Sequence, residues 1–385
     1  MKIGLVLAYK GVNYGMLLQA YATQRVIEKL GYDTEVLDYT RTNLKHVRFT
    51  PWLLFYFLDE LKRRKKHKER RELFHDEIHV NNVIERKKVS SEFVDKYITN
   101  QIKCVGIDEL EAKGRNLNGV VVGSDQIWPP DAAFGNFTTM RFVPDDINKI
   151  SYATSLGVSS YPYWCKSSAA NFLKRINHVS VREEQGKNII NEISDVSVEV
   201  VADPTYLMTK EEWLELIPFN KVIDGEYALC YFLGDTKEHK ELAKAYAKKH
   251  NIRLVSILST ESYSDIDLTF ADEIITGRGP ADFINLIRNA KVVLTDSFHG
   301  LAFSVINNVP FHVFYRTKVG SKGSRNSRID NILKMWGLED RLVHNDASVC
   351  DFDNNSINYE LVNERIAEIR AQSMKYLIDA LNDCK

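Results

Sequence analysis

Short apolar runs alternate with amphipathic stretches along most of the chain. In the first half, such runs predict strands at 2–8, 33–39, 119–123, 149–155 and 178–182, with a helix over about 14–30. Strands that alternate with helices form parallel sheets covered by helices on both faces. This half is therefore predicted to be a doubly wound α/β unit.

A second series of the same kind follows a turn-rich stretch at 218–226. Predicted strands at 227–233, 252–258, 291–295 and 310–315 alternate with helices at 237–250 and 280–288. The fold class is therefore α/β, with two Rossmann-like doubly wound domains that face a cleft. We expect an N-terminal domain over 1–217, a C-terminal domain over 218–352, and an amphipathic helix over 358–383 that caps the second domain or crosses back to the first.

Composition narrows the class of protein. The chain of 385 residues is 44% hydrophobic and 27% charged, with a formal net charge of −1, which is typical of a globular protein and predicts no nucleic acid partner. Its five cysteines form no CxxC or CxxH pair, so we expect no metal site, no disulfide framework and a reducing, cytoplasmic location. The N-terminal MKIGLVLAYKG lacks a cleavage site and is interpreted as a first strand rather than a signal peptide.

One segment suggests contact with a membrane surface. No run of 18 apolar residues is present, but the apolar aromatic stretch 51–61 leads directly into the basic block 62–71. A helix over 51–77 would either lie at the inner face of the cell membrane, as a peripheral contact through 51–71, or pack on the domain with its charges in water.

Candidate binding residues follow the predicted strands, because ligands of doubly wound sheets bind at the carboxyl ends of strands. The first strand is not followed by GxGxxG, and GxxxxGK[ST] is absent, so neither a dinucleotide nor a Walker-type phosphate site is indicated. Asn13 and Tyr14 follow the first strand, where glycines and an asparagine suit either an anion at a helix N-terminus or a tight turn.

Asp125, Gln126 and Trp128 follow the strand at 119–123. A carboxylate, an amide and an aromatic ring suit the hydroxyls and the apolar face of a sugar. The alternative is that Asp125 caps a helix and Trp128 belongs to the core. Together with Asn13 and Tyr14, these three residues form the candidate acceptor side.

Two further positions favour acid–base or anion chemistry. Arg182 lies at the tip of a buried strand, where it holds either an anionic ligand or a structural ion pair with Asp203. His299 begins a helix with Ser297 as predicted N-cap, and the positive end of the helix dipole favours a neutral imidazole that acts as base or acid. Gly300 would let a ligand approach closely.

Arg325 and Arg328 lie in a Gly/Ser-rich loop at 320–329, which either binds an anion or is simply exposed.

Seven stretches taken in order resemble the polysaccharide pyruvyl transferase family over roughly residues 1–335: NYGMLLQAYA, VGSDQIW, YATSLG, SVREEQG, DPTYLM, DSFHGLAFS and SRI. The resemblance implies two domains of glycosyltransferase-B type. It also implies ketal pyruvyl transfer from phosphoenolpyruvate (PEP), a co-substrate, to two hydroxyls of a sugar in a bacterial surface polysaccharide (capsule or exopolysaccharide) or its lipid-linked oligosaccharide precursor, without a cofactor.

The resemblance also assigns site residues. His299 matches the family's catalytic histidine, and Arg182 matches an arginine that holds the donor, with Ser297, Phe298 and Gly300 beside it. Members commonly carry an arginine two positions before the histidine, where this chain has Ser297. We therefore expect Arg325 or Arg328 to supply the missing charge.

Two rival functions remain open on the sequence. One is a glycosyltransferase of the same fold that uses a nucleotide-sugar donor, although an ExxxxxxxE pattern in a suitable place is lacking. The other is a non-catalytic protein that binds an anionic sugar. The order of the seven motifs favours the pyruvyltransferase.

Overall fold

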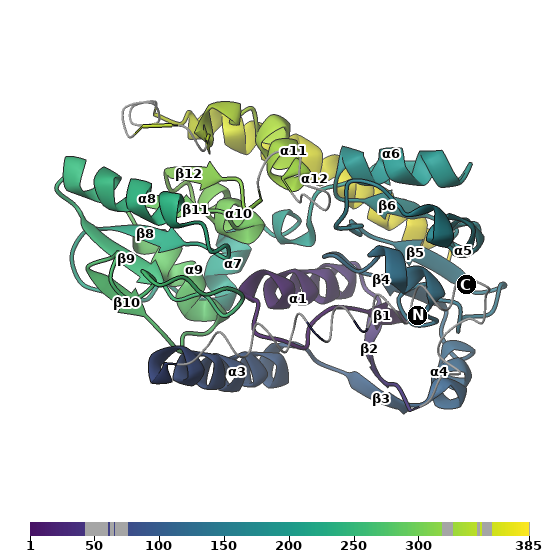
Figure 1. Ribbon diagram of the computed structural model, residues 1–385. Helices are drawn as coiled ribbons and strands as arrows, with labels where there is room; N and C mark the ends of the chain where they lie inside the picture. Colours follow the sequence, from purple (N-terminus) through teal and green to yellow (C-terminus); the bar gives the residue numbers. More distant parts are fainter. Residues whose placement is uncertain are drawn as a thin grey trace.

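Two parallel sheets, each covered by helices, make up the protein (Figure 1). The computed structural model describes residues 1–42, 61, 65, 76–317, 326–344, 347–348 and 356–384. The two sheets lie side by side, with the first half of the chain in one and the second half in the other. The fold is α/β, as predicted.

The first sheet has the strand order β3-β2-β1-β4-β5, all parallel. Its strands are β1 (Lys2–Val6), β2 (Asp33–Thr40), β3 (Gln101–Val105), β4 (Gly119–Val122) and β5 (Asn148–Ser151). The strand β4 reads GVVV and is buried throughout, as expected for a central parallel strand with helices on both faces. Beyond β5, the short pair β6 (Val179–Val181) and β7 (Val198–Val200) continues the sheet through isolated bridges.

The second sheet repeats the order, β10-β9-β8-β11-β12-β13. Its strands are β8 (Tyr227–Tyr231), β9 (Arg253–Ile257), β10 (Glu273–Ile275), β11 (Val292–Thr295), β12 (Phe311–Phe314) and β13 (Leu342–Val343). In each sheet the strands are added first to one side of the first strand and then to the other. The strand order therefore reverses between β1 and β4 in the first sheet and between β8 and β11 in the second. Ligands of doubly wound sheets bind at such switch points.

Helices cover the faces of both sheets and join them. They are α1 (Tyr14–Lys29), α3 (Glu77–Tyr97), α4 (Ile107–Gly114), α5 (Tyr163–Leu173), α6 (Glu184–Ile193), α7 (Lys210–Leu216), α8 (Lys237–Lys249), α9 (Pro280–Asn289), α10 (Phe298–Ile306), α11 (Ser327–Trp336) and α12 (Tyr359–Asn382), with short 3-10 turns at Pro130–Phe134, Pro204–Tyr206 and Glu339–Arg341. The boundary expected at 218–226 falls between α7 and β8. One apolar core runs from α1 of the first domain into α9 and α10 of the second.

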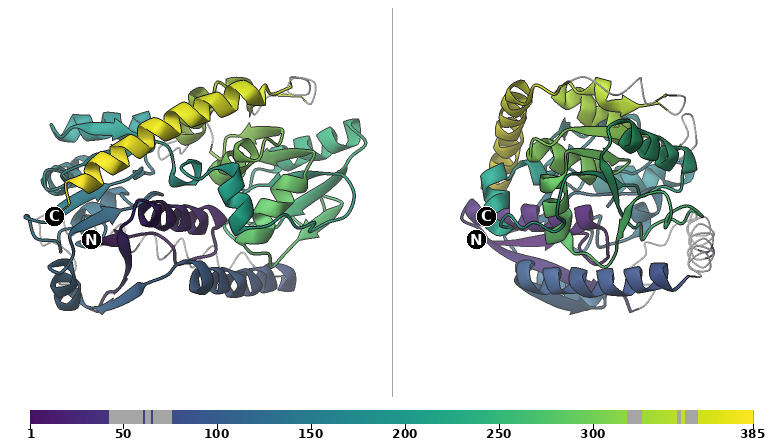
Figure 2. Two further views of the ribbon diagram at one scale, coloured as in Figure 1. Left: turned by 180° about the vertical axis from the view of Figure 1, so that it is seen from behind. Right: turned by 90° about the vertical axis from the view of Figure 1, so that its left-hand side faces the viewer.

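The C-terminal helix α12 crosses back to the first domain. The left view of Figure 2, seen from behind, shows it running diagonally across the near face from the second domain to the first sheet. Arg365 at its start donates to the carbonyl oxygen of Trp336 in α11, and Tyr376 near its end donates to that of Ser151 in β5. Of the two sequence-based alternatives for this helix, the structure shows the crossing.

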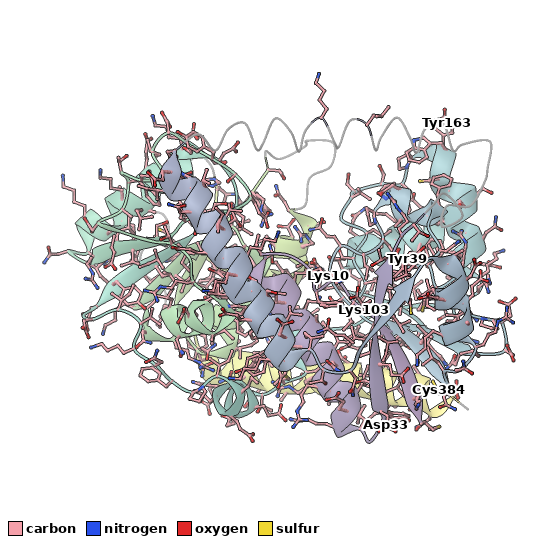
Figure 3. All side chains as sticks on the ribbon, turned by 90° about the horizontal axis from the view of Figure 1, so that it is seen from below. Lys10, Asp33, Tyr39, Lys103, Tyr163 and Cys384 are labelled. Atoms are coloured by element: carbon pink, nitrogen blue, oxygen red, sulfur yellow. The ribbon has the colours of Figure 1, made fainter. Side chains whose placement is uncertain are left out.

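The helix α3 forms a second bridge between the domains. It lies across the second domain in the view from below (Figure 3). Arg86 of α3 is buried, donates to the carbonyl oxygen of Leu258, and stacks on Tyr14 with 4.6 Å to the ring centroid. The two domains are thus held together from both sides of the cleft.

Four strands were not predicted, namely β3, β7, β10 and β13. Each is short or lies at or next to a sheet edge, where only part of the strand is buried and the apolar signal is weak. The predicted helix over 51–77 and Arg325 fall outside the described residues, except for Leu61, Lys65, Asp76 and Glu77. Within the described part of the chain, helices long and apolar enough to cross a membrane are lacking.

Candidate active site

The turn from β11 to α10 carries His299, and its hydrogen bonds explain the sequence TDSFHG. Thr295 Oγ1 donates to the carbonyl oxygen of Tyr231 at 2.6 Å and accepts from Ser297 N at 3.0 Å. Ser297 Oγ accepts from Gly300 N at 3.2 Å, so Ser297 is the N-cap, as predicted. A methyl group on Gly300 would lie 2.5 Å from Thr295 Oγ1. Gly300 is therefore required by the tight turn, and it makes no room for a ligand.

Asp296 ties this turn to the loop after β8. Its carboxylate accepts from Leu233 N at 2.7 Å and from Gly234 N at 2.8 Å. The side chain is buried, and both of its oxygen atoms are occupied by these backbone donors. Asp296 thus closes the switch point between the two central strands and fixes the start of α10.

His299 is held between the two domains. Its Nε2 lies 3.7 Å from Oδ2 of Asp203, is buried, and makes no hydrogen bond. This separation is too long for a hydrogen bond but short enough for a strong electrostatic interaction with a protonated ring. On the other side of the ring, a methyl group on Gly15 of α1 would lie 1.9 Å from Nδ1.

Arg182 stands next to this pair and is fully enclosed. It donates from Nη1 to Asp203 Oδ2 at 2.8 Å and from Nε to Glu183 Oε1 at 3.3 Å, and its Nη2 lies 4.0 Å from Asp125 Oδ1. The guanidinium also lies over the ring of Phe298, 4.3 Å from its centroid. The ion pair between Arg182 and Asp203, one of the two alternatives drawn from the sequence, is therefore present. Nη2 is the guanidinium nitrogen left without a hydrogen bond.

Asp203 is the charge at the centre of the cluster. Burial would raise the pKa of its carboxyl group, but the neighbouring His299 and Arg182 outweigh burial and hold that pKa far below its ordinary value. Burial would lower the pKa of the Arg182 guanidinium, but Glu183, Asp203 and Asp125 together raise it above its ordinary value. Oδ1 of Asp203 accepts from both the backbone and the hydroxyl of Thr205, and Oδ2 accepts from Ser124 Oγ. An ionised Asp203 therefore faces the imidazole of His299.

A cavity of about 260 Å³ opens above His299. Loops that follow strands of both sheets line it, which places it where the two switch points meet. Its lining residues are Asn13, Asp125, Gln126, Leu233, Glu261, Ser297, Phe298, His299, Arg316 and Arg328.

Three of the predicted acceptor residues line this cavity. Asn13 caps α1 by accepting from Met16 N, and its Nδ2 donates to Glu261 Oε1 at 2.6 Å. Asp125 has a φ of 77°, a left-handed conformation that Asp tolerates better than most residues, and it caps no helix. Gln126 lies next to it.

The other two predicted acceptor residues belong to the core. Tyr14 is fully buried, donates to the carbonyl oxygen of Arg278 at 2.9 Å and stacks on Phe283. Trp128 is 1% exposed and donates from its indole to the carbonyl oxygen of Thr138 at 2.9 Å. Neither ring is accessible to a sugar in this structure. Trp128 therefore belongs to the core, as the alternative interpretation had it, and Tyr14 is also a core residue rather than an acceptor-binding one.

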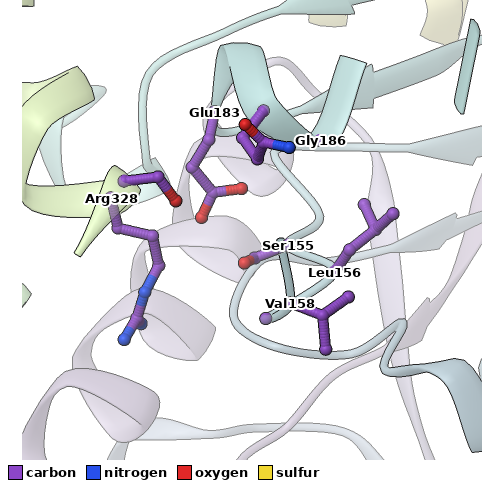
Figure 4. Close-up of a pocket in the computed structure, with 9 residues that line it drawn as sticks. Ser155, Leu156, Val158, Glu183, Gly186 and Arg328 are labelled. Carbon is purple, nitrogen blue, oxygen red and sulfur yellow. The ribbon is translucent and has the colours of Figure 1, made fainter. Parts of the chain in front are cut away.

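Arg328 lies at the edge of the cavity on the side of the second domain. It also lines a smaller neighbouring pocket with Ser155, Glu183 and Gly186, which Figure 4 shows. Arg328 thus reaches the cleft, as the sequence-based expectation required.

Sequence reasoning missed the positions that complete the site from elsewhere in the chain. Glu261 follows β9 and Arg316 follows β12, so the strand-end rule that selected the others applies to them too. Asn331 of α11 donates to the carbonyl oxygen of Arg182 at 3.2 Å and accepts from Glu184 N at 3.3 Å, which holds the turn before α6. Only the packing of α11 on α6 reveals that contact.

Known proteins support both the fold and the family. Among solved structures, UDP-GlcNAc 2-epimerase from Neisseria meningitidis matches with a TM-score of 0.51 and 11% identity over 99% of each chain. The epimerase from Methanocaldococcus jannaschii matches with a TM-score of 0.52 and 14% identity over 99% of each chain. At these identities the likeness concerns the fold alone, which is of glycosyltransferase-B type.

No curated protein matches the sequence. The family model for polysaccharide pyruvyl transferase, in contrast, matches residues 13–317, which is most of the chain and includes every cavity residue up to Arg316. The chain therefore belongs to the polysaccharide pyruvyl transferase family and is a transferase.

Proposed function

We propose that the enzyme transfers the pyruvyl group of PEP as a ketal to two hydroxyls of one sugar, with His299 as the acid–base residue. The observation that carries this proposal is the contact of His299 with ionised Asp203 below a cavity lined by both domains. Because Nε2 faces Asp203, the nitrogen that exchanges a proton with the substrates is Nδ1, on the side of Gly15.

The reaction begins with protonation of the methylene carbon of PEP by the imidazolium of His299. The carbon next to it then carries oxocarbenium character, and a sugar hydroxyl attacks it while the hydroxyl proton returns to His299. Cleavage of the bond to the phosphate oxygen releases phosphate. A second hydroxyl attacks the same carbon and closes the ketal, and its proton leaves on phosphate.

The remaining cavity residues divide between donor and acceptor. PEP carries a carboxylate and a phosphate, which require cations and N–H donors. Arg328 and the N–H groups at the start of α10 beside Ser297 and Phe298 supply these on the second-domain side. Arg182 of the first domain, whose guanidinium lies over the ring of Phe298, adds its positive charge. Asn13, Asp125 and Gln126 face them from the first domain, where their oxygen and amide groups suit sugar hydroxyls.

We further propose that the acceptor is a lipid-linked precursor of a surface polysaccharide such as a capsule or exopolysaccharide. The apolar and basic segment 51–71 supports this proposal through its sequence, because such a segment suits an anionic membrane surface. It would bring the enzyme to the inner face of the membrane, where lipid-linked acceptors are found.

Incubation with PEP and a panel of galactose- and N-acetylhexosamine-ended glycolipids tests the reaction. We expect phosphate release together with a product whose mass rises by one pyruvate less one water. His299→Ala should abolish both signals, while His250→Ala, an exposed histidine of the second domain, should leave them unchanged. Stabilisation of the fold by UDP or GDP but not by PEP would favour a nucleotide-sugar donor instead.

A further inference from the structure

The arginine common in the family two positions before the histidine is replaced here by a residue that cannot supply charge. Ser297 is 3% exposed, and its hydroxyl is occupied as the N-cap of α10. An anionic donor next to His299 therefore needs a further cation, besides Arg328, from another element.

The register of the second sheet brings Arg316 to this place. β11 and β12 are parallel neighbours, with Thr295 opposite Val313. Residues that follow the two strands leave the sheet at the same edge, so Ser297 and Arg316 both face the cavity. Gly234 leaves space at this place, because a methyl group on Gly234 would lie 2.9 Å from Asp296 Oδ2 and 3.3 Å from Arg316 Cγ.

Among the described residues, the guanidinium of Arg316 has few partners. Its Nη1 contacts Oε2 of Glu261 at the long distance of 3.5 Å, and its Nε is buried without a hydrogen bond. A guanidinium has five N–H donors, and a buried donor without a partner destabilises the structure. A bound carboxylate or phosphate would satisfy these donors.

Glu261 connects this arginine to the first domain. Its Oε1 accepts from Asn13 Nδ2 at 2.6 Å, while its Oε2 faces Arg316. The chain Asn13, Glu261 and Arg316 therefore spans the cleft, with the Glu261 carboxylate placed as an anion in front of the guanidinium. An anionic donor would compete with Glu261 for Arg316.

We propose that Arg316 is a donor-binding residue that replaces the arginine absent at position 297, and that Glu261 holds it in place until an anionic end of the donor takes over the contact. This inference rests on the proposed function, since it names PEP as the ligand. It concerns binding of the donor, so its signature is the KM for PEP.

Steady-state kinetics of Arg316→Gln, Arg316→Lys and Glu261→Gln test the inference. A hydrogen bond to a charged group is worth about 1.5–3 kcal/mol, so Arg316→Gln should raise the KM for PEP by about 10- to 100-fold and leave the KM for the acceptor unchanged. Arg316→Lys should recover part of the loss. Glu261→Gln should lower the KM for PEP, because it removes a negative charge that competes with the donor.

The matched control is Arg253→Gln. Arg253 also forms an ion pair at 3.5 Å, with Glu273, in the same domain but away from the cavity. Its loss should not alter the KM for PEP, and melting temperatures of all variants will show whether each one folds. Inorganic phosphate and pyruvate, used as competitive inhibitors, show which end of PEP Arg316 binds. The compound that resembles the bound end should inhibit Arg316→Gln more weakly than the wild type.

Each outcome has one meaning. Suppose that the wild type turns over PEP. If folded Arg316→Gln then has an unchanged KM for PEP, or if both anions inhibit it as they inhibit the wild type, the role of Arg316 is overturned and the proposed function stands. A higher KM for PEP in Glu261→Gln overturns the role of Glu261 as a competing anion. A wild type that neither binds nor turns over PEP overturns both proposals.

Discussion

The imidazole of His299 lies directly against the α-carbon of Gly15, so that a methyl group there would stand 1.9 Å from Nδ1. The two residues belong to different domains, one at the start of α10 and the other at the start of α1. Glycine at position 15 is therefore what allows the histidine to occupy its place between the domains.

Gly15→Ala should lower kcat without unfolding the enzyme. In a helix this change normally stabilises by up to about 1 kcal/mol, but here the methyl group must displace the imidazole. A displacement of about 1 Å can cost about 100-fold in rate, so we expect a fall in kcat of this order. Gly135→Ala is the control, because a methyl group there would meet only a carbonyl oxygen at 3.5 Å. Full activity of Gly15→Ala would show that the ring position is not critical.

Asp203→Asn should lower kcat while the enzyme still binds PEP. The substitution keeps the shape of the side chain but removes the negative charge that lies 3.7 Å from Nε2 of His299. Acid–base catalysis contributes about 100- to 10,000-fold, and we expect a loss within this range. The pH profile of kcat is the decisive measurement, since an altered profile indicates a change at the acid–base group and an unaltered one indicates that Asp203 only supports the fold.

Asp203 should also make the fold sensitive to acid. Its folded-state pKa is lowered, so its contribution to stability is complete above the unfolded-state pKa of about 4 and is lost as pH falls below it. The unfolding free energies of wild type and Asp203→Asn should therefore converge by about 1.4 kcal/mol per pH unit below pH 4. Urea titrations between neutral and acid pH measure this, with exposed Asp265→Asn as the control that should run parallel to the wild type.

Ser297→Ala should cost stability through the loss of the helix cap. The Ser297 hydroxyl accepts from Gly300 N at 3.2 Å, and replacement of such a cap by alanine costs about 1 kcal/mol. Because the serine supplies no charge, the KM for PEP should change far less than in Arg316→Gln. A rise in KM equal to that of Arg316→Gln would show that the hydroxyl itself binds the donor.

Trp128→Phe should affect folding and leave the acceptor KM unchanged. The indole is buried, and its loss removes a hydrogen bond to Thr138 worth about 1 kcal/mol as well as contact with Phe172. Asp125→Asn, in the cavity, should instead raise the acceptor KM. Thermal unfolding and acceptor titration separate the two effects. A higher acceptor KM in folded Trp128→Phe would show that the indole ring contacts the acceptor.

Much of the fold was predictable because its signals are local. The buried run GVVV of β4, the amphipathic pattern of α12 and the TDSFHG turn each depend on side chains a few residues apart, and their periodicity predicts strand, helix and turn. The same local reasoning selected His299 and Asp125, because both follow strands whose carboxyl ends meet a cleft. The order of seven short motifs was sufficient to predict the family.

What only the tertiary structure decided is which of these residues meet. Gly15, Asp203 and His299 come from three distant parts of the chain, and their contact exists only because the two sheets dock with their switch points facing each other. Packing within each domain buried Trp128 in the core of the first, made Arg182 the partner of Asp203, and brought Arg316 to the same cavity as Ser297 through the register of β11 and β12. Hydrophobic periodicity specifies which face of an element is buried, whereas the charge and hydrogen-bond partners of a side chain depend on what the opposite element presents.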